Sequence, residues 1–181
     1  SGVFIHERHV MDESGRGNSI RRLEGWWGHD EESRFKMSPE FQPIPSAEAW
    51  QMSNAPIMNM AVHKVALDLF LEAGMTSLLE RSRRLTAYLE TVVHLVAERT
   101  ATNLEILTPV DPTSRGCQLS VVAHGYGRTL FDHLTAHGVV VDWREPAVIR
   151  MAPVPLYNTF EDVVRFGQVL EAGLGEVAAK A

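Results

Sequence analysis

Cysteine is nearly absent from this sequence, and its first residues carry none of the usual start signals. The 181 residues contain one cysteine, Cys117, which cannot form a disulfide within the chain. A lack of disulfides is typical of reducing compartments, so we expect a cytoplasmic protein. The first residues, Ser1-Gly2-Val3-Phe4-Ile5, include neither an initiator methionine nor a signal peptide. We therefore expect the sequence to start in the middle of a domain.

Long hydrophobic runs and blocks of positive charge are also missing. No apolar run approaches the roughly 20 residues that a membrane-spanning helix needs. The formal net charge is −6, and lysine and arginine form no cluster. We therefore expect neither a membrane nor a nucleic acid as partner. With 45% hydrophobic and 22% charged residues, the composition is that of a soluble globular protein.

Aromatic residues, by contrast, are concentrated in one region without regular periodicity, residues 20–55. This region follows a polar turn at residues 12–19 and contains Trp26, Trp27 and Trp50. A structureless segment of this length is uncommon in a compact domain unless it lines a site or is disordered. Three indoles argue against disorder. The region is therefore expected to be an ordered pocket wall or an interface.

Hydrophobic periodicity predicts the regular elements. Helices are expected over residues 57–72, 76–99 and 127–137 and from 158 onward, and strands over residues 3–6, 104–107, 117–122, 139–141 and 148–151. Gly74 should end the first helix, and Asn158 with Glu161 should cap the last one. From residue 76 the order α-β-β-α-β-β-α predicts an α+β domain with helices on one face of a small sheet.

Three short patterns resemble reactive sites, but structural explanations are favoured for each. His133 and His137 have the spacing of two metal ligands on a helix, yet no third ligand accompanies them, so no metal site is expected. Residues 15–19 resemble a phosphate loop without its lysine or its strand–loop–helix context, which favours a plain turn. Cys117 lies among apolar residues of an expected strand, which favours a buried thiol over a nucleophile.

Arg150 is a stronger candidate for a functional residue. It lies in the apolar strand Val148-Ile149-Arg150-Met151, which the pattern would bury. Burying a guanidinium is costly unless an anion pairs with it. Two explanations stay open: an internal salt bridge, or a bidentate clamp on a substrate carboxylate.

Trp26 and Asn54 also carry polar groups that need partners. An indole N–H is a donor only and usually finds an acceptor when buried. Asn54 precedes the expected helix start at Pro56, so capping is its ordinary role. Both residues could instead donate to an anion near the positive end of that helix.

Seven motifs follow one another along nearly the whole chain. They are Arg22-Leu-Glu-Gly-Trp-Trp-Gly-His29, Arg34-Phe-Lys-Met37, Ser53-Asn-Ala-Pro-Ile57, Arg115-Gly-Cys-Gln-Leu-Ser120, Thr135-Ala-His-Gly138, Asp142-Trp-Arg-Glu-Pro146 and Ile149-Arg-Met-Ala-Pro-Val-Pro-Leu-Tyr-Asn158. In combination they resemble one family, kynureninase, a pyridoxal 5'-phosphate (PLP) enzyme of the aspartate aminotransferase superfamily. The chain is similar to the C-terminal portion of such an enzyme.

The resemblance implies a fold and a domain organisation. It implies the α/β fold of PLP-dependent transferases, with the C-terminal part of the large domain followed by a small α+β domain. The helices of the small domain would pack on one face of a mostly antiparallel sheet. The implied boundaries are residues 1–56 for the large-domain part, 57–74 for a connecting helix and 75–181 for the small domain.

The resemblance also implies an activity. Kynureninases hydrolyse L-kynurenine or 3-hydroxykynurenine to anthranilate or 3-hydroxyanthranilate and L-alanine. This reaction belongs to tryptophan catabolism, in the kynurenine pathway that leads to NAD biosynthesis. The implied cofactor is PLP, and the implied assembly is a homodimer with the active site at its interface.

Four site residues carry over from the family. Trp26 and Asn54 match positions that contact the cofactor phosphate across the dimer interface. Arg150 matches the arginine that binds the substrate α-carboxylate, and Trp27 matches an aromatic side chain lining the aryl pocket. No metal ligand is implied.

The lysine that forms a Schiff base with PLP in this family has no counterpart in the chain. It is expected upstream of the position equivalent to Ser1, and Lys36, Lys64 and Lys180 do not match it. The resemblance therefore places no catalytic residue in this chain and implies that the chain alone is inactive. Two alternatives remain open: a non-catalytic domain that binds a partner, and another PLP lyase of the same superfamily.

Overall fold

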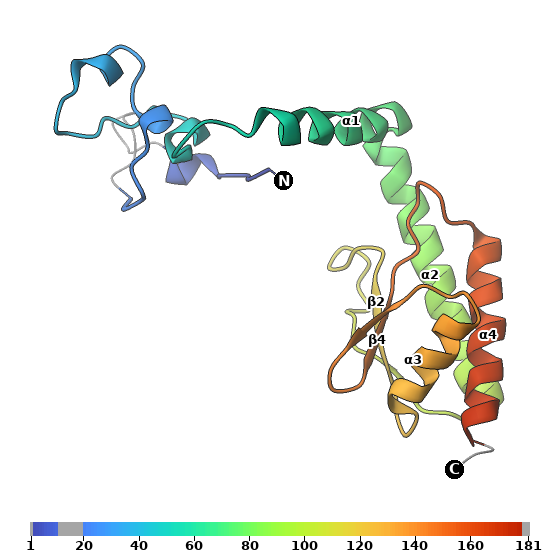
Figure 1. Cartoon of the computed structure of the whole chain (residues 1–181). Coiled ribbons are helices and arrows are strands. Elements are labelled where there is room, and N and C mark those ends of the chain that lie inside the picture. Colours follow the sequence, from blue (N-terminus) through green and yellow to red (C-terminus); the bar gives the residue numbers. More distant parts are fainter. Residues whose placement is uncertain (1, 11–19, 179–181) are drawn as a thin grey trace. The chain divides into compact units, whose positions relative to one another are not determined.

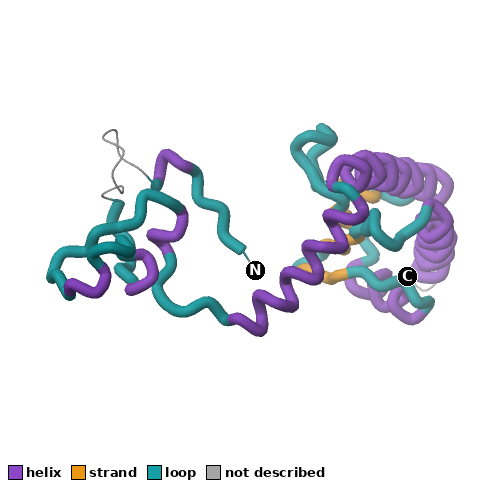
Figure 2. Tube along the Cα trace, turned by 90° about the horizontal axis from the view of Figure 1, so that it is seen from above, coloured by secondary structure: helices purple, strands orange, loops and turns teal. Residues whose placement is uncertain are grey.

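The computed structural model describes residues 2–10 and 20–178. The chain divides into two compact units, Ser1–Leu69 and Phe70–Ala181, and the boundary falls within the helix α1, Ile57–Ala73. Four α-helices and four strands are found in the described ranges (Figure 1). All four strands belong to the second unit, whereas the first is mostly loop (Figure 2). The polar turn and the loop expected over residues 12–19 lie outside the described residues.

The second unit is built on a small antiparallel sheet. Its strands are β1 (Leu104–Ile106), β2 (Leu119–Ala123), β3 (Asp142–Arg144) and β4 (Val148–Met151). They lie in the order β1-β2-β4-β3, and every neighbouring pair is antiparallel. The expected α+β arrangement with an antiparallel sheet is therefore confirmed.

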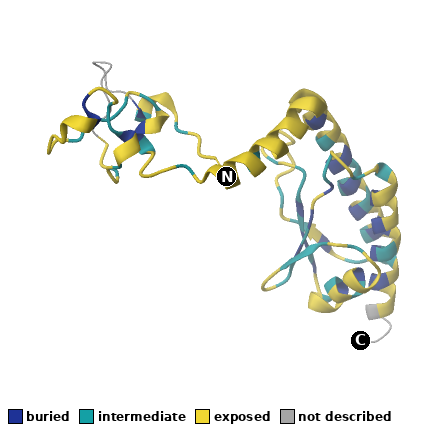
Figure 3. Cartoon of the chain, turned by 45° about the horizontal axis from the view of Figure 1, so that its top comes forward, coloured by how far each residue is buried: buried dark blue, intermediate teal, exposed yellow. Residues whose placement is uncertain are grey.

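Three helices cover one face of this sheet (Figure 1). They are α2 (Met75–Thr100), α3 (Gly127–Ala136) and α4 (Phe160–Ala178). Burial alternates along β2 and β4, where the helix-facing residues Leu119, Val121, Ile149 and Met151 are buried. Each buried aliphatic side chain of this kind contributes roughly 1.5–3 kcal/mol to folding. Figure 3 shows buried residues on the helices and on the strands of this unit. The alternate residues of β4, including Arg150, lie on the opposite face, because successive side chains of a strand point to opposite faces.

The ends of two helices test the expected caps. Gly74 adopts φ +79°, a left-handed conformation that favours glycine, and separates α1 from α2 as expected. The expected cap of α4 by Asn158 and Glu161 is wrong by one residue. The Thr159 hydroxyl accepts a bond from the Asp162 N–H at 3.2 Å, while the Asp162 carboxylate accepts one from the Thr159 N–H at 2.8 Å. This reciprocal pair is a capping box.

Two expected strands are displaced or missing. Residues 3–6 do not form a strand, because no described segment pairs with them, and Val3 and Phe4 are exposed. The strand expected over residues 139–141 begins at Asp142 instead, because the hairpin register pairs Asp142 with Arg150. The three consecutive valines at residues 139–141 have a high β propensity, so the strand was predicted three residues before its actual start.

The first unit contains short 3₁₀ turns and the start of α1. The turns are Glu7–His9, Trp26–Gly28, Arg34–Lys36 and Ala47–Trp50. The helix α1 has the expected bounds to within one residue, and its apolar residues Ile57, Met60, Ala61 and Val65 are exposed. No residue of α1 is buried among the described parts of the chain. In these described parts, no helix combines the length and apolar character needed to cross a membrane.

Candidate functional site

Two glycines allow the tandem-tryptophan segment to lie directly against residues 49–52. A Cβ atom on Gly25 would meet the Met52 Cα at 2.1 Å, and one on Gly28 would meet the Ala49 carbonyl oxygen at 2.5 Å. Real side chains do not approach backbone this closely, so only glycine fits at either position. The two glycines therefore hold the backbone on either side of Trp26 and Trp27 against this second segment of the chain.

This packing brings two of the expected site residues together. The Trp27 indole Nε1 donates a short hydrogen bond to the Asn54 side-chain oxygen. Trp26 faces a different neighbour: its ring lies edge-on to Phe35, with centroids 5.4 Å apart and planes at 77°. Trp27 and Asn54 thus form one contact pair, and Trp26 lies beside a separate hollow.

That hollow has a volume of about 270 Å³ and contains a buried cation. Trp26, His29, Arg34 and Phe41 are among its lining residues. The Arg34 guanidinium lies 4.9 Å from the Trp27 ring centroid and donates to the His29 carbonyl at 2.9 Å. Its Nε is buried without a hydrogen-bond partner, and no carboxylate of the described residues pairs with it. Glu24 and Glu40 also line the hollow, so its lining carries charges of both signs.

A turn next to the hollow holds this arrangement in place. The Asp30 carboxylate accepts hydrogen bonds from the Ser33 hydroxyl at 2.8 Å and the Ser33 N–H at 3.1 Å. The Ser33 hydroxyl bond is the main cause that lowers the pKa of Asp30 below the ordinary aspartate value. Asp30 is therefore ionised at neutral pH and fixes the backbone that precedes Arg34.

In the second unit, Arg150 lies on the sheet face that the helices leave open. The register places it opposite Ser120 of β2 on one side and Asp142 of β3 on the other. Its Nε donates to Asp142 Oδ2 at 2.7 Å, and its Nη2 makes a short contact with the same oxygen. The side chain is still 31% exposed. The internal salt bridge, one of the two explanations left open for Arg150, is present, and the guanidinium also reaches solvent.

Arg150 borders a depression of about 520 Å³ on this open face. Other lining residues are Thr108, Ser114, Arg115, Gln118, Ser120 and Arg144. Arg115 pairs with Glu90, and Arg144 and Arg150 share Asp142. Among the described residues, these three arginine guanidiniums are therefore paired with only two carboxylates. One positive charge is left over, which suits a ligand with a single negative charge.

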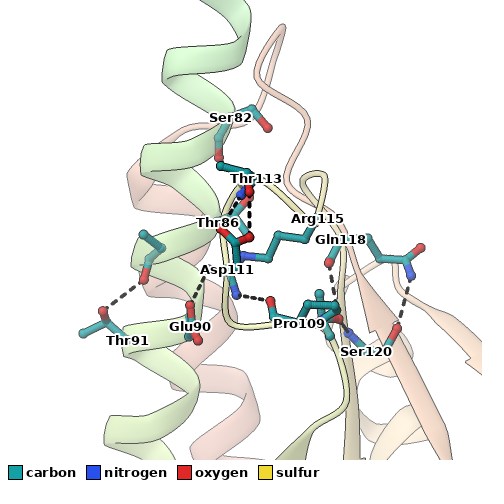
Figure 4. Close-up of polar contacts among 12 residues, drawn as sticks. Ser82, Thr86, Glu90, Thr91, Pro109, Asp111, Thr113, Arg115, Gln118 and Ser120 are labelled. Atoms are coloured by element: carbon teal, nitrogen blue, oxygen red, sulfur yellow. Dashed lines mark hydrogen bonds and ion pairs between the residues drawn. The ribbon is translucent and has the colours of Figure 1, made fainter.

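One wall of the depression is held by the partly buried pair Arg115 and Glu90. Figure 4 shows Arg115 on the loop before β2, reaching toward α2. Its Nη2 lies 2.5 Å from Glu90 Oε2, and its Nη1 donates to the Pro109 carbonyl at 3.2 Å. Deeper along the wall, the Gln118 amide donates to the Ser120 hydroxyl at 3.2 Å. These bonds fix the loop that faces Arg150.

The side chains considered earlier as metal or nucleophile candidates have structural surroundings. His133 and His137 stack at 4.1 Å, and Glu176 lies 3.5 Å from His133. No group of three metal-ligating side chains is found in the described ranges. Cys117 is half-buried and precedes β2, so the expectation that it lies mid-strand is wrong.

Two residues of the site were given no role from the sequence: Asp142 and Arg34. Both belong to motifs noted above, but their partners are distant in sequence or set by strand register. The only available signal for Asp142 was an acidic residue in a strand that must pair with the strand of Arg150. For Arg34, it was an arginine within an aromatic-rich segment.

Comparison with known proteins assigns the chain to a family. The model of the kynureninase C-terminal domain matches residues 78–170. A kynureninase from Flavobacterium psychrophilum is 48% identical over 176 residues, which cover 97% of this chain and 40% of that protein. A kynureninase from Christiangramia forsetii is 49% identical over 174 residues, 96% of this chain and 40% of that protein. A kynureninase from Xanthomonas oryzae pv. oryzae is 50% identical over 172 residues, 93% of this chain and 38% of that protein.

The similarity extends through both units. The chain spans about two fifths of the length of these curated relatives. The region matched by the family model contains all four strands of the sheet. Arg150 lies on the face of this sheet that the helices leave open. The chain belongs to the kynureninase family.

Proposed function

We propose that this chain is the C-terminal part of an enzyme that hydrolyses L-kynurenine or 3-hydroxykynurenine. The products would be anthranilate or 3-hydroxyanthranilate, and L-alanine, in cytoplasmic tryptophan catabolism. The observation that carries the proposal is the half-exposed Arg150 guanidinium on the open sheet face, bordering a depression with one excess positive charge. Family membership supplies the reaction class for that anion site.

Arg150 would bind the α-carboxylate of the substrate. A planar guanidinium matches a carboxylate with two parallel hydrogen bonds, which fix the orientation as well as the charge of the ligand. The remaining polar side chains of the depression, Thr108, Ser114, Gln118 and Ser120, are neutral and would not repel an anion. Binding through Arg150 would orient the amino acid without touching its reacting carbonyl.

Trp26 and Asn54 are suited to hold the phosphate of PLP. The Trp26 indole N–H has no hydrogen-bond partner in the described chain, and the residue is 42% exposed. The Asn54 oxygen is occupied by Trp27, which leaves its amide nitrogen as a donor. Asn54 also precedes the start of α1 at Ile57, where a helix favours an anion.

Trp27 would line the pocket for the aryl ring of kynurenine. Its indole is fixed on one edge by the bond to Asn54 and on one face by Arg34. A fixed aromatic plane can stack on the flat ring of the substrate and exclude water from it. The residue would therefore contribute to substrate choice.

PLP, when bound, would supply the electron sink for the cleavage reaction. We propose that the Schiff-base lysine belongs to the part of the kynureninase fold outside the sequence described here, and that the chain alone is inactive. The proposed domains are residues 1–56 of the large domain, a connecting helix over 57–74 and a small domain over 75–181. The active enzyme would be a homodimer, with Trp26 and Asn54 acting across the interface.

Replacing Arg150 tests the carboxylate role in the complete enzyme. We expect Arg150→Gln to lower kcat/KM for L-kynurenine by at least about thirtyfold, because losing a charged contact of this kind costs ~2 kcal/mol. The loss should fall mainly on KM, and PLP absorbance should be retained. Arg83→Gln, on an exposed surface of α2, is the matched control. Unchanged kinetics for Arg150→Gln would rule out the carboxylate clamp.

A further inference from the structure

We infer that Asp142 is a positioning residue that holds the Arg150 guanidinium with one edge committed to the protein and the other kept for a carboxylate ligand. This inference rests on the proposed carboxylate role of Arg150. The two explanations first considered for Arg150, a salt bridge and a substrate clamp, are then compatible. The salt bridge is what makes the clamp rigid.

The atoms in contact define which edge of Arg150 is occupied. Asp142 Oδ2 accepts from both Nε and Nη2 of Arg150. A guanidinium has five N–H donors in a plane, arranged along a side edge (Nε and Nη2) and an end edge (Nη1 and Nη2). Asp142 therefore takes the side edge with a single oxygen. The end edge, formed by Nη1 and the second Nη2 proton, remains available for a bidentate carboxylate.

The backbone places Asp142 in this role through strand register. Asp142 and Arg150 are directly paired residues of β3 and β4, whose hairpin fixes the register at three consecutive pairs. Side chains of directly opposed residues start about 5 Å apart on the same face of a sheet. Arg150 is flanked on its other side by Ser120, which is too short to hold the guanidinium by two bonds. Asp142 is thus the residue that fixes its orientation.

Arg144 increases the importance of the Asp142 charge. Its Nε lies 3.1 Å from Asp142 Oδ2, the same oxygen that binds Arg150. One carboxylate oxygen therefore neutralises two neighbouring guanidiniums. Without that charge, Arg144 and Arg150 would repel each other, and Arg150 would lose both its anchor and its preferred orientation. Arg144 is 60% exposed and can be solvated, so its own loss should matter less.

The test compares three variants of the complete PLP-bound enzyme. We expect Asp142→Asn to raise KM for L-kynurenine about tenfold, equivalent to ~1.4 kcal/mol, with kcat within threefold of wild type and PLP absorbance unchanged. Arg144→Gln is the comparison variant: it removes one positive charge from the depression but leaves the Asp142–Arg150 bonds in place, so its KM should rise less than that of Asp142→Asn. A general loss of folding would reduce kcat and PLP content instead, so the split between KM and kcat identifies positioning.

The outcomes separate this inference from the proposed function. If Arg150→Gln leaves KM unchanged, the carboxylate clamp itself is wrong. If Arg150→Gln raises KM but Asp142→Asn does not, the clamp stands and the positioning role of Asp142 is overturned. A larger effect from Arg144→Gln than from Asp142→Asn would also overturn it.

A second measurement needs no altered Asp142. In the 181-residue chain, the Nε–Hε group of Arg150 should give a resolved, slowly exchanging nitrogen-15 NMR signal, because it is bonded to Asp142. The signal is assigned by its loss in Arg150→Gln. We expect it to persist in Arg144→Gln. A rapidly exchanging Arg150 signal in the wild-type chain would show that the side edge is not held, and would overturn the inference even if Asp142→Asn does not fold.

Discussion

Two ion pairs of the second unit differ strongly in how far their charged groups are buried. Arg115 is only 6% exposed, and its partner Glu90 lies at 2.5 Å. Arg99 and Glu171, by contrast, form an exposed pair at 3.4 Å. The energetic value of these two pairs differs because a buried charge that loses its partner cannot be rehydrated.

The Arg115–Glu90 pair yields the first residue-scale prediction. We expect Glu90→Gln to lower the free energy of unfolding by about 3–5 kcal/mol, because it leaves the Arg115 charge buried without a counter-ion. Glu171→Gln, which breaks the exposed pair with Arg99, should cost at most about 1 kcal/mol. Urea unfolding followed by circular dichroism measures both. Equal effects of the two variants would contradict the account of the depression wall in Figure 4.

Asp111, in the loop of the same wall, yields a prediction about pH. Its carboxylate accepts bonds from the Thr113 hydroxyl at 2.6 Å and the Thr113 N–H at 2.9 Å. The hydroxyl bond is the main cause that lowers the pKa of Asp111 in the folded state. Because the folded pKa lies below the unfolded value, this contribution to stability is present above the unfolded pKa of about 3.9 and is lost as the pH falls through the folded pKa.

Carbon-13 NMR of the Asp111 carboxyl group measures that titration directly. We expect its midpoint to lie below that of an unstructured aspartate in the wild-type chain. Thr113→Val removes the hydroxyl donor and should move the midpoint upward, while the backbone N–H bond remains. If Thr113→Val leaves the midpoint unchanged, the hydroxyl bond is not the main cause of the lowered pKa.

At the scale of elements, helices were predicted more accurately than strands. The bounds of α1, α2 and α3 agree with expectation to within one residue. In α2 and α3 the apolar residues recur with a clear helical period, whereas the ends of α1 were placed from Pro56 and Gly74. β3 was placed too early because Val139, Val140 and Val141 carry strong β propensity, yet register with β4 decides where pairing begins. Residues 3–6 have the composition of a strand without a described neighbour to pair with.

For the site as well, single residues could be predicted from local sequence patterns, but their hydrogen-bond partners could not. Trp26, Trp27, Asn54 and Arg150 were singled out from motifs and from the unusual position of polar groups among apolar residues. The Trp27–Asn54 bond joins residues 27 positions apart, and the Asp142–Arg150 bond depends on a hairpin register. Neither partner could be chosen from spacing alone, because several polar residues nearby were equally plausible.

The contact between α3 and α4 yields a prediction at the element scale. A Cβ on Gly173 would lie 2.6 Å from His133 and 3.0 Å from Leu130, both on α3. We expect Gly173→Ala to lower the free energy of unfolding by about 1–3 kcal/mol through overpacking. Gly175, two residues further along α4, has no neighbour within 4 Å, so Gly175→Ala should stabilise by up to about 1 kcal/mol. Thermal unfolding of the pair should therefore show shifts of opposite sign, and shifts of the same sign would contradict the helix packing.

At the scale of the whole molecule, the exposure of α1 is the most prominent feature. Apolar residues on all sides of this helix, including Ile57, Val62, Val65 and Leu71, are exposed. A helix that is apolar all round is normally buried. The chain spans about two fifths of its curated relatives, so the remaining part of the kynureninase fold is the expected cover for α1.

The most direct test of the central claim is the release of anthranilate from L-kynurenine, followed by its fluorescence. Two samples with PLP are compared: the complete enzyme that contains this chain, and the 181-residue chain alone. We expect steady anthranilate production from the complete enzyme and none from the chain alone. A complete enzyme that binds PLP but releases no anthranilate or 3-hydroxyanthranilate from either kynurenine substrate would contradict the proposed function.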